Sequence, residues 1–171
     1  MSFLLFPGYN IFDNMVSELG IGPGGLFFNV GLVLSGIVAI PFIIRLGTVF
    51  LGENVNNYLR KSAMIIAVTS SVSLSLIGCF PATPENAIVF IIHGTFAFIC
   101  WIGGLIYVTI FSIMMFQAPN ISKSWAFFGF GVAATFVLFL FTGLPITEWI
   151  VVFAICLWAI VNSINILRNK I

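Results

Sequence analysis

The sequence predicts an all-α integral membrane protein, a bundle of five transmembrane helices. The chain is 61% hydrophobic and only 6% charged, whereas about 25% of the residues of an ordinary globular domain are charged. Its mean hydropathy is +1.21. Its long apolar runs approach or exceed the roughly 20 residues that cross the hydrocarbon of a bilayer. They lack the period-2 alternation of barrel strands, so we expect helices, which satisfy their own backbone hydrogen bonds in lipid.

The charged residues divide between the two ends of these runs. All six Lys and Arg fall on one side, namely Arg45, Arg60, Lys61, Lys123, Arg168 and Lys170. Four of the five acids fall on the other side, namely Asp13, Glu18, Glu85 and Glu148, and Glu53 is the exception. Lys and Arg in short loops mark the cytoplasmic side. We therefore expect a multi-pass protein of the cell membrane, with the N-terminus external and the C-terminus cytoplasmic.

Residues 1–25 form the external segment that precedes the first span. Asn10 is a candidate helix cap, and Ile11, Met15 and Leu19 recur at the spacing of one helix face. The pattern predicts a short amphipathic helix that packs on the outer end of the bundle, because it lacks the Lys and Arg of an anionic-lipid binder. The glycine-rich run 20–25 then turns the chain, without the Lys and Ser or Thr of a phosphate-binding loop.

Residues 26–171 form the transmembrane bundle. We place its five helices at about 26–51, 62–80, 87–116, 125–141 and 149–167. The third run exceeds a minimal span, which predicts a tilted or inward-projecting helix. The connectors are too short to hold a soluble catalytic domain.

Small residues at helical spacing indicate where these helices touch. Rows of small residues four apart let helix backbones approach closely in a membrane. We assign helix packing to seven such positions, namely Gly31, Ser35, Ser71, Ser75, Gly104, Gly129 and Ala133. The serines are expected to bond neighbouring carbonyls rather than to act as nucleophiles.

His93 is the histidine of the sequence, about six residues or roughly 9 Å inside the third span. It shares a helix face with Ala97, Cys100 and Gly104, so we expect it to point into the bundle. An ionisable group at membrane depth is a functional-site candidate. The alternative is a neutral histidine that holds helices together through a hydrogen bond to Asn29 or a serine.

Five polar residues are predicted near the outer end and form a candidate lipid or headgroup site, namely Glu18, Asn29, Glu85, His93 and Glu148. A carboxylate and an imidazole at one opening suit a cation, a headgroup amine or proton exchange. His93, Glu18 and Asn29 are the candidates for catalysis. A single histidine argues against a multi-histidine zinc or haem site from this chain, so we expect no metal and no cofactor. The six positive charges are scattered and do not form the basic stripe of a nucleic-acid-binding surface, so we expect no nucleic-acid partner.

Several short elements resemble a known family, namely residues 7–10 (PGYN), 17–20 (SELG), 28–32 (FNVGL), 78–81 (GCFP) and His93. Together they resemble the prokaryotic membrane family catalogued as domain of unknown function nine-nine-eight, over roughly residues 7–105. More distantly they resemble eukaryotic membrane proteins that remodel lipid on GPI anchors or modulate autophagy. Glu18 stands where the family usually has an aspartate. The family commonly has one more helix before the proline-glycine element, so we expect that helix to be missing or supplied by another chain.

Two classes of function follow from these observations. The first is a small non-catalytic integral membrane subunit or scaffold that packs within a larger membrane complex, in contact with lipid and other membrane subunits. The second is a lipid-handling membrane enzyme or carrier with an outer-leaflet site around His93, Asn29 and Glu18. The small size and the short connectors favour the first class.

Overall fold

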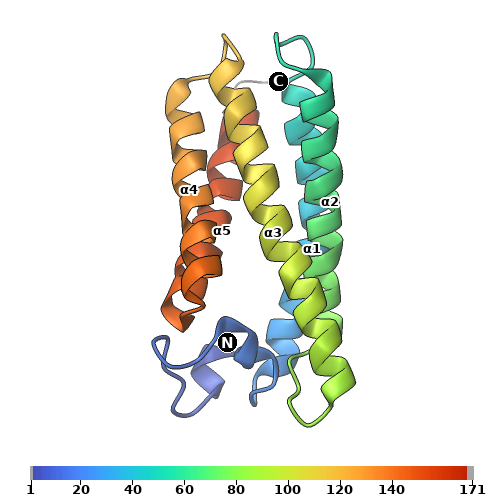
Figure 1. Cartoon of the computed structure of the whole chain (residues 1–171), viewed down its shortest axis with the longest axis vertical. Helices are drawn as coiled ribbons and strands as arrows, with labels where there is room; N and C mark the ends of the chain where they lie inside the picture. The colour runs from blue at the N-terminus through green and yellow to red at the C-terminus, as the bar shows by residue number, and fades with distance from the viewer. Residues whose placement is uncertain (1, 169–171) are drawn as a thin grey trace.

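Five long helices make up most of the described part of the chain, residues 2–168 of a computed structural model (Figure 1). They are α1 (Gly25–Val49), α2 (Asn57–Cys79), α3 (Ala87–Gln117), α4 (Lys123–Thr142) and α5 (Pro145–Arg168). All five are long and apolar enough to cross a membrane. The prediction of an all-α membrane bundle is therefore confirmed. Two short 3₁₀ helices, η1 (Phe3–Leu5) and η2 (Val16–Gly20), precede α1.

The second and fifth helices begin several residues before the apolar runs that predict them. The side chain of Asn56 accepts a hydrogen bond from the backbone N–H of Tyr58 and so caps a polar first turn of α2. Pro145 opens α5, where its fixed φ suits the first helical position and its missing N–H removes no helix bond. Hydropathy alone does not detect either start, because both first turns carry polar residues.

Helices that follow one another in the chain also pack against one another, from α1 with α2 to α4 with α5. Contacts between α5 and α1 close the bundle. The largest fully buried side chains, Trp158, Phe111, Leu46 and Met114, come from α1, α3 and α5. At the end of the bundle that carries the N-terminal segment, α3 leans away from α4 (Figure 1). The N-terminal segment lies across the bundle at this end. We name the two ends by what they carry: the N-terminal end has residues 2–24, and the C-terminal end has the connectors 50–56 and 118–122.

Small residues mediate several of the helix contacts. A Cβ atom added at Gly36 of α1 would collide with the carbonyl of Ser71 and the hydroxyl of Ser75 in α2. Ser75 Oγ also donates a hydrogen bond of 3.1 Å to the carbonyl oxygen of Val33 across the same interface. On the other side of the bundle, Gly104 of α3 faces the ring of Phe136 in α4. The backbones therefore approach where the side chains are smallest.

Gly129 and Ala133 lie on the buried face of α4. A Cβ atom at Gly129 would overlap the hydroxyl of Ser112 and stand 3.2 Å from the indole nitrogen of Trp158. The small residues Gly31 and Ser35 of α1 are exposed instead of buried. A Cβ atom at Gly31 would meet nothing within 4 Å. Within this chain the contact of α1 with α2 uses Gly36, one position beyond Ser35, which the sequence spacing did not single out.

The N-terminal segment does not form the amphipathic helix that the spacing of Ile11, Met15 and Leu19 predicts. Residues 11–13 form a turn and Asn14 a bend, and the helix that follows them is the five-residue η2. The side chain of Asn10 accepts from the backbone N–H of Phe12 and donates to Asp13, while Asn14 accepts from the N–H of Asn10. Asn and Asp side chains that bond local backbone groups in this way compete with a helix.

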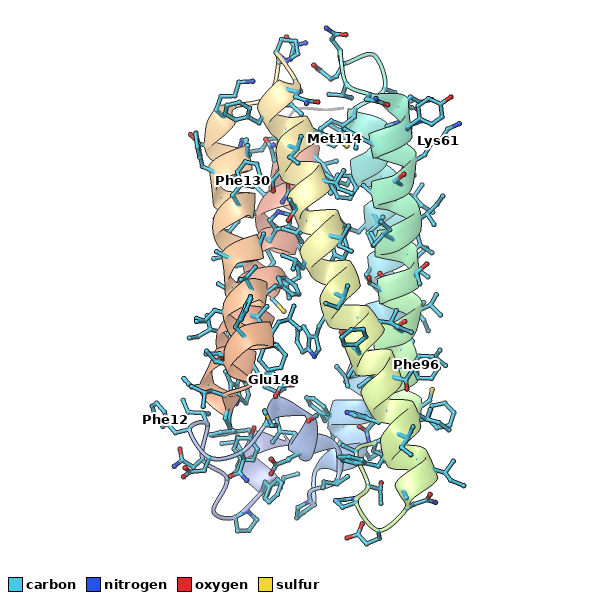
Figure 2. The ribbon with its side chains drawn as sticks, in the orientation of Figure 1. Phe12, Lys61, Phe96, Met114, Phe130 and Glu148 are labelled. Atoms are coloured by element: carbon cyan, nitrogen blue, oxygen red, sulfur yellow. The ribbon has the colours of Figure 1, made fainter. Side chains whose placement is uncertain are left out.

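The charges are divided between the two ends as the sequence predicts. Among the described residues, Arg45, Arg60, Lys61, Lys123 and Arg168 belong to the C-terminal end or to the helix turns beside it. Lys170 lies outside the described residues. The acids Asp13, Glu18, Glu85 and Glu148 belong to the N-terminal end, whereas Glu53 lies in the connector between α1 and α2. Figure 2 places Lys61 and Glu148 at these two ends.

Candidate functional site

Glu148, in the first turn of α5, is the most deeply buried acid that the structure describes. Its side chain is 6% exposed and faces the N-terminal segment (Figure 2). Oε2 of its carboxylate accepts a hydrogen bond of 2.7 Å from the backbone N–H of Val16, the first residue of η2. A buried carboxylate requires such donors, because burial without them is costly. This bond fixes the position of η2 against α5.

Glu18 lies within η2 and bonds the backbone that leads into it. Its Oε1 accepts a hydrogen bond of 2.9 Å from the N–H of Met15, and its Oε2 accepts one of 2.8 Å from the side-chain amide of Asn14. Both carboxylate oxygens therefore have donors within the N-terminal segment. The arrangement satisfies one of the amides that the start of a helix leaves without a partner.

Tyr9 and Trp149 join the same region through an aromatic cluster. The phenol of Tyr9 lies 2.8 Å from the carbonyl oxygen of Met15, to which it donates, and the indole N–H of Trp149 donates to it at 3.2 Å. Phe3 packs edge-on against both rings. Burial raises the pKa of Tyr9, and the carboxylates of Glu148 and Glu18 raise it further, although the bond from Trp149 lowers it. The phenol therefore remains protonated and continues to donate.

Asn29, in the second turn of α1, closes the loop between η2 and α1. Its side-chain amide donates a hydrogen bond of 2.9 Å to the carbonyl oxygen of Gly20. A Cβ atom at Gly20 would stand 2.6 Å from Oδ1 of the same amide, so a side chain there would displace the amide of Asn29. The glycine-rich run thus works as a tight turn, which Asn29 holds onto the first helix.

His93, in the second turn of α3, is 7% exposed. Its ring nitrogen Nδ1 lies 2.8 Å from the carbonyl oxygen of Phe80, the residue that follows α2 directly. A carbonyl only accepts, so Nδ1 carries the proton and donates. The imidazole therefore ties α3 to the carboxyl end of α2. Sequence reasoning placed His93 inside the bundle, but it named Asn29 or a serine as the partner.

The five predicted residues fall into two groups. Glu148 of α5 and Asn29 of α1 bond the first and last residues of η2, and Glu18 lies within η2 and bonds the residues before it. His93 of α3 bonds the carbonyl of Phe80 just after α2, and Glu85 is exposed on the connector between α2 and α3. Among the described hydrogen bonds, none joins His93 to Glu18, Asn29 or Glu148. The hydrogen bonds at the N-terminal end thus dock the N-terminal segment onto the helices. The bond from His93 separately joins α3 to the end of α2.

Four of the five polar side chains, all except Glu85, bond backbone groups of the same chain. Such bonds position the backbone and leave the imidazole and the carboxylates turned toward the protein. Within residues 2–168, no group of three or more His, Cys, Asp or Glu side chains that could hold a metal ion is found.

Sequence reasoning missed Tyr9 and Trp149 as members of this network. A signal was present, since Tyr and Trp concentrate where a membrane meets water. Trp149 follows Glu148 directly, and Tyr9 lies in the proline-glycine element of the sequence.

A comparison with protein families finds a match that covers nearly the whole bundle. The family model described as "Protein of unknown function (DUF998)" matches residues 1–165. The chain belongs to this family. The match to DUF998 includes η2, all of α1 to α4 and most of α5, so it extends well beyond the motifs between residues 7 and 105. No curated protein and no solved structure matches the chain.

Proposed function

We propose that this member of DUF998 is a small non-catalytic integral membrane subunit, which packs as a scaffold within a larger membrane complex. The observation that carries the proposal is the exposed small-residue face of α1. Gly31 and Ser35 lie four residues apart on that face, with exposed Leu34 and Val38 beside them. Small residues at this spacing are typical of surfaces where a second transmembrane helix docks.

The position of α1 in the bundle supports this assignment. Of the five spans, α1 is the least buried within the protein: 11% of its most apolar stretch is buried. Its contacts inside the chain are made by the opposite face, through Gly36 and Gly47. A helix in contact only with lipid has no need for glycine, which weakens a helix by roughly 0.8–1.0 kcal/mol relative to alanine. A partner helix that approaches closely gives Gly31 a role.

The polar residues of the N-terminal end support a structural role as well. His93, Glu148, Glu18 and Asn29 each bond the backbone of their own chain. Their arrangement suits the docking of the N-terminal segment onto the helices. We infer that the chain contributes shape and helix surface to its complex, and that chemistry belongs to a partner.

The test compares Gly31, on the proposed docking face of α1, with two helix glycines elsewhere, Gly94 of α3 and Gly131 of α4. Gly31, Gly94 and Gly131 are exposed, and a Cβ atom at each would meet nothing within 4 Å, so a side chain at each position starts in open space. Tagged wild-type chain and the variants Gly31→Leu, Gly94→Leu and Gly131→Leu are expressed in the native host and purified in mild detergent. Copurifying proteins are then quantified by mass spectrometry.

We expect a partner at constant stoichiometry with the wild type, Gly94→Leu and Gly131→Leu. Gly31→Leu should reduce the partner by about tenfold or more, the equivalent of about 1.4 kcal/mol in association. The thermal stability of the purified chain should not fall in any variant. A single-chain particle that carries bound lipid and is indifferent to Gly31→Leu would instead support the lipid-handling alternative around His93, Asn29 and Glu18.

A further inference from the structure

Glu53, in the connector between α1 and α2, is the acid that breaks the division of charge. Its carboxylate has two different environments. Oε1 accepts a hydrogen bond of 3.1 Å from the side-chain amide of Asn120, in the connector between α3 and α4. Oε2 is buried and has no hydrogen-bond partner among residues 2–168. A buried carboxylate oxygen without a donor is costly, so this oxygen calls for a ligand.

Glu53 belongs to the wall of a cavity. The cavity has a volume of about 40 Å³ and lies between the connectors and α5 at the C-terminal end. Its polar lining consists of Glu53, Asn120, Asn162 and Asn165, and its apolar lining includes Phe50 and Met115. A particle of water size needs roughly 10–15 Å³ of such space. The cavity therefore has room for a small ion or a few waters.

Two amides of the lining, Asn120 and Asn162, have their nitrogens engaged in hydrogen bonds. The nitrogen of Asn120 is engaged by Glu53, and the nitrogen of Asn162 donates a 2.7 Å bond to the carbonyl oxygen of Trp158. An amide whose nitrogen is engaged offers its carbonyl oxygen as an acceptor. With Oε2 of Glu53, these groups make a set of oxygen donors that carries a single negative charge.

Two nearby cationic side chains, Arg60 and Lys123, have other hydrogen-bond partners, although Arg60 lines a second pocket together with Glu53. The guanidinium of Arg60 donates to the side-chain oxygen of Asn57 at 2.8 and 3.1 Å. The ammonium of Lys123 donates to the carbonyl oxygens of Phe116 and Ala118. Neither Arg60 nor Lys123 lines the cavity.

We propose that this cavity binds one monovalent hard cation, with Na⁺ as the representative, through Glu53, Asn120 and Asn162. Carboxylate and amide oxygens are the donors that hard cations prefer, and one negative charge matches one positive charge. The three ligands come from the α1–α2 connector, the α3–α4 connector and α5, so the ion links three parts of the C-terminal end. The inference is independent of the partner proposed for α1.

The test measures thermal unfolding of the purified chain in lipid nanodiscs as NaCl replaces choline chloride at constant ionic strength. A ligand that binds only the folded state raises the melting temperature with concentration. We expect a saturable rise for the wild type. Glu53→Gln keeps the shape but removes the charge, and it should weaken the apparent Na⁺ affinity by about tenfold or more, since ligand charge sets cation affinity.

Two further variants make the result decisive. Asn120→Ala changes an exposed residue and should weaken Na⁺ affinity with the fold intact, which covers the case that Glu53→Gln fails to fold. Glu85→Gln removes an exposed carboxylate from the opposite end and should leave the Na⁺ response unchanged. An equal response to Na⁺ in Glu53→Gln and the wild type, the absence of any Na⁺-specific rise, or a rise with Ca²⁺ or Mg²⁺ alone would overturn the assignment.

Discussion

The hydrogen bond of His93 involves one particular ring nitrogen, and this detail determines which side chains can replace it. Nδ1 is attached directly to Cγ, and it faces the carbonyl of Phe80 at 2.8 Å. The side-chain nitrogen of Asn is also attached to Cγ, whereas that of Gln is one bond further from the backbone. A structural role that depends on Nδ1 therefore predicts rescue by Asn rather than by Gln.

We expect His93→Asn to keep most of the stability of the wild type. His93→Leu leaves the Phe80 carbonyl without its donor and should lose about 1–3 kcal/mol of unfolding free energy, and His93→Gln should resemble it. Reversible unfolding in detergent mixtures measures the three variants. A His93→Leu variant as stable as the wild type would mean that the bond contributes nothing, and rescue by Gln alone would assign the role to Nε2.

The sequence predicted that His93 faces inward, because its neighbours at helical spacing are small and weakly polar. It did not predict the partner. The carbonyl of Phe80 is accessible because α2 ends there and the chain turns, and a backbone acceptor has no signature among residue types. For the same reason Glu148 was placed at the correct end, while its donor, the N–H of Val16, was not foreseen.

In α4 two glycines two residues apart have opposite surroundings. Gly129 faces Ser112 and Trp158, whereas Gly131 lies on the exposed face with nothing near its missing Cβ atom. Both carry the same helix propensity. Their different contacts therefore separate the cost of packing from the intrinsic cost of glycine.

Gly129→Ala is expected to destabilise the bundle and Gly131→Ala to leave it unchanged or slightly more stable. Overpacking in a filled core costs about 1–3 kcal/mol, while an exposed glycine replaced by alanine gains up to roughly 1 kcal/mol of helix propensity. Melting temperatures of the two purified variants provide the comparison. Equal shifts would show that the α3–α4–α5 contact has room at Gly129.

The N-terminal segment illustrates the limit of periodicity as a signal. Ile11, Met15 and Leu19 have helical spacing, yet Asn10 and Asn14 bond the local backbone and turn the chain before a helix forms. The five spans contain long apolar runs, and there the sequence was sufficient. In a short polar segment, side-chain bonds to the backbone outweigh the spacing of three apolar residues.

The distribution of charge gives the bundle two chemically different ends. Arg45, Arg60, Lys61, Lys123 and Arg168 mark the C-terminal end among the described residues, and Glu53 is the acid beside them. The positive-inside rule then favours a cytoplasmic position for this end. This orientation remains a prediction from the sequence.

Single cysteines test the orientation. In a background without Cys79, Cys100 and Cys156, which are free thiols, Ser122→Cys should react with a membrane-impermeant maleimide only after the cells are opened. Glu85→Cys should react in intact cells. Both positions are exposed in the structure, so access to the reagent depends on the membrane. The reverse pattern of labelling would place the network of Glu18, Glu148 and His93 on the cytoplasmic side.

The bond between Val16 and Glu148 joins residues 132 positions apart in the chain. Ribosomes deliver Val16 before the five spans described here, and Glu148 only with the fifth of them. The N-terminal segment is therefore synthesised long before Glu148, and it stays undocked while α1 to α4 are inserted. Contacts that close such long loops form late. We expect this bond to mark the final step of assembly, so that a chain arrested before α5 displays an undocked N-terminus to proteases and chaperones.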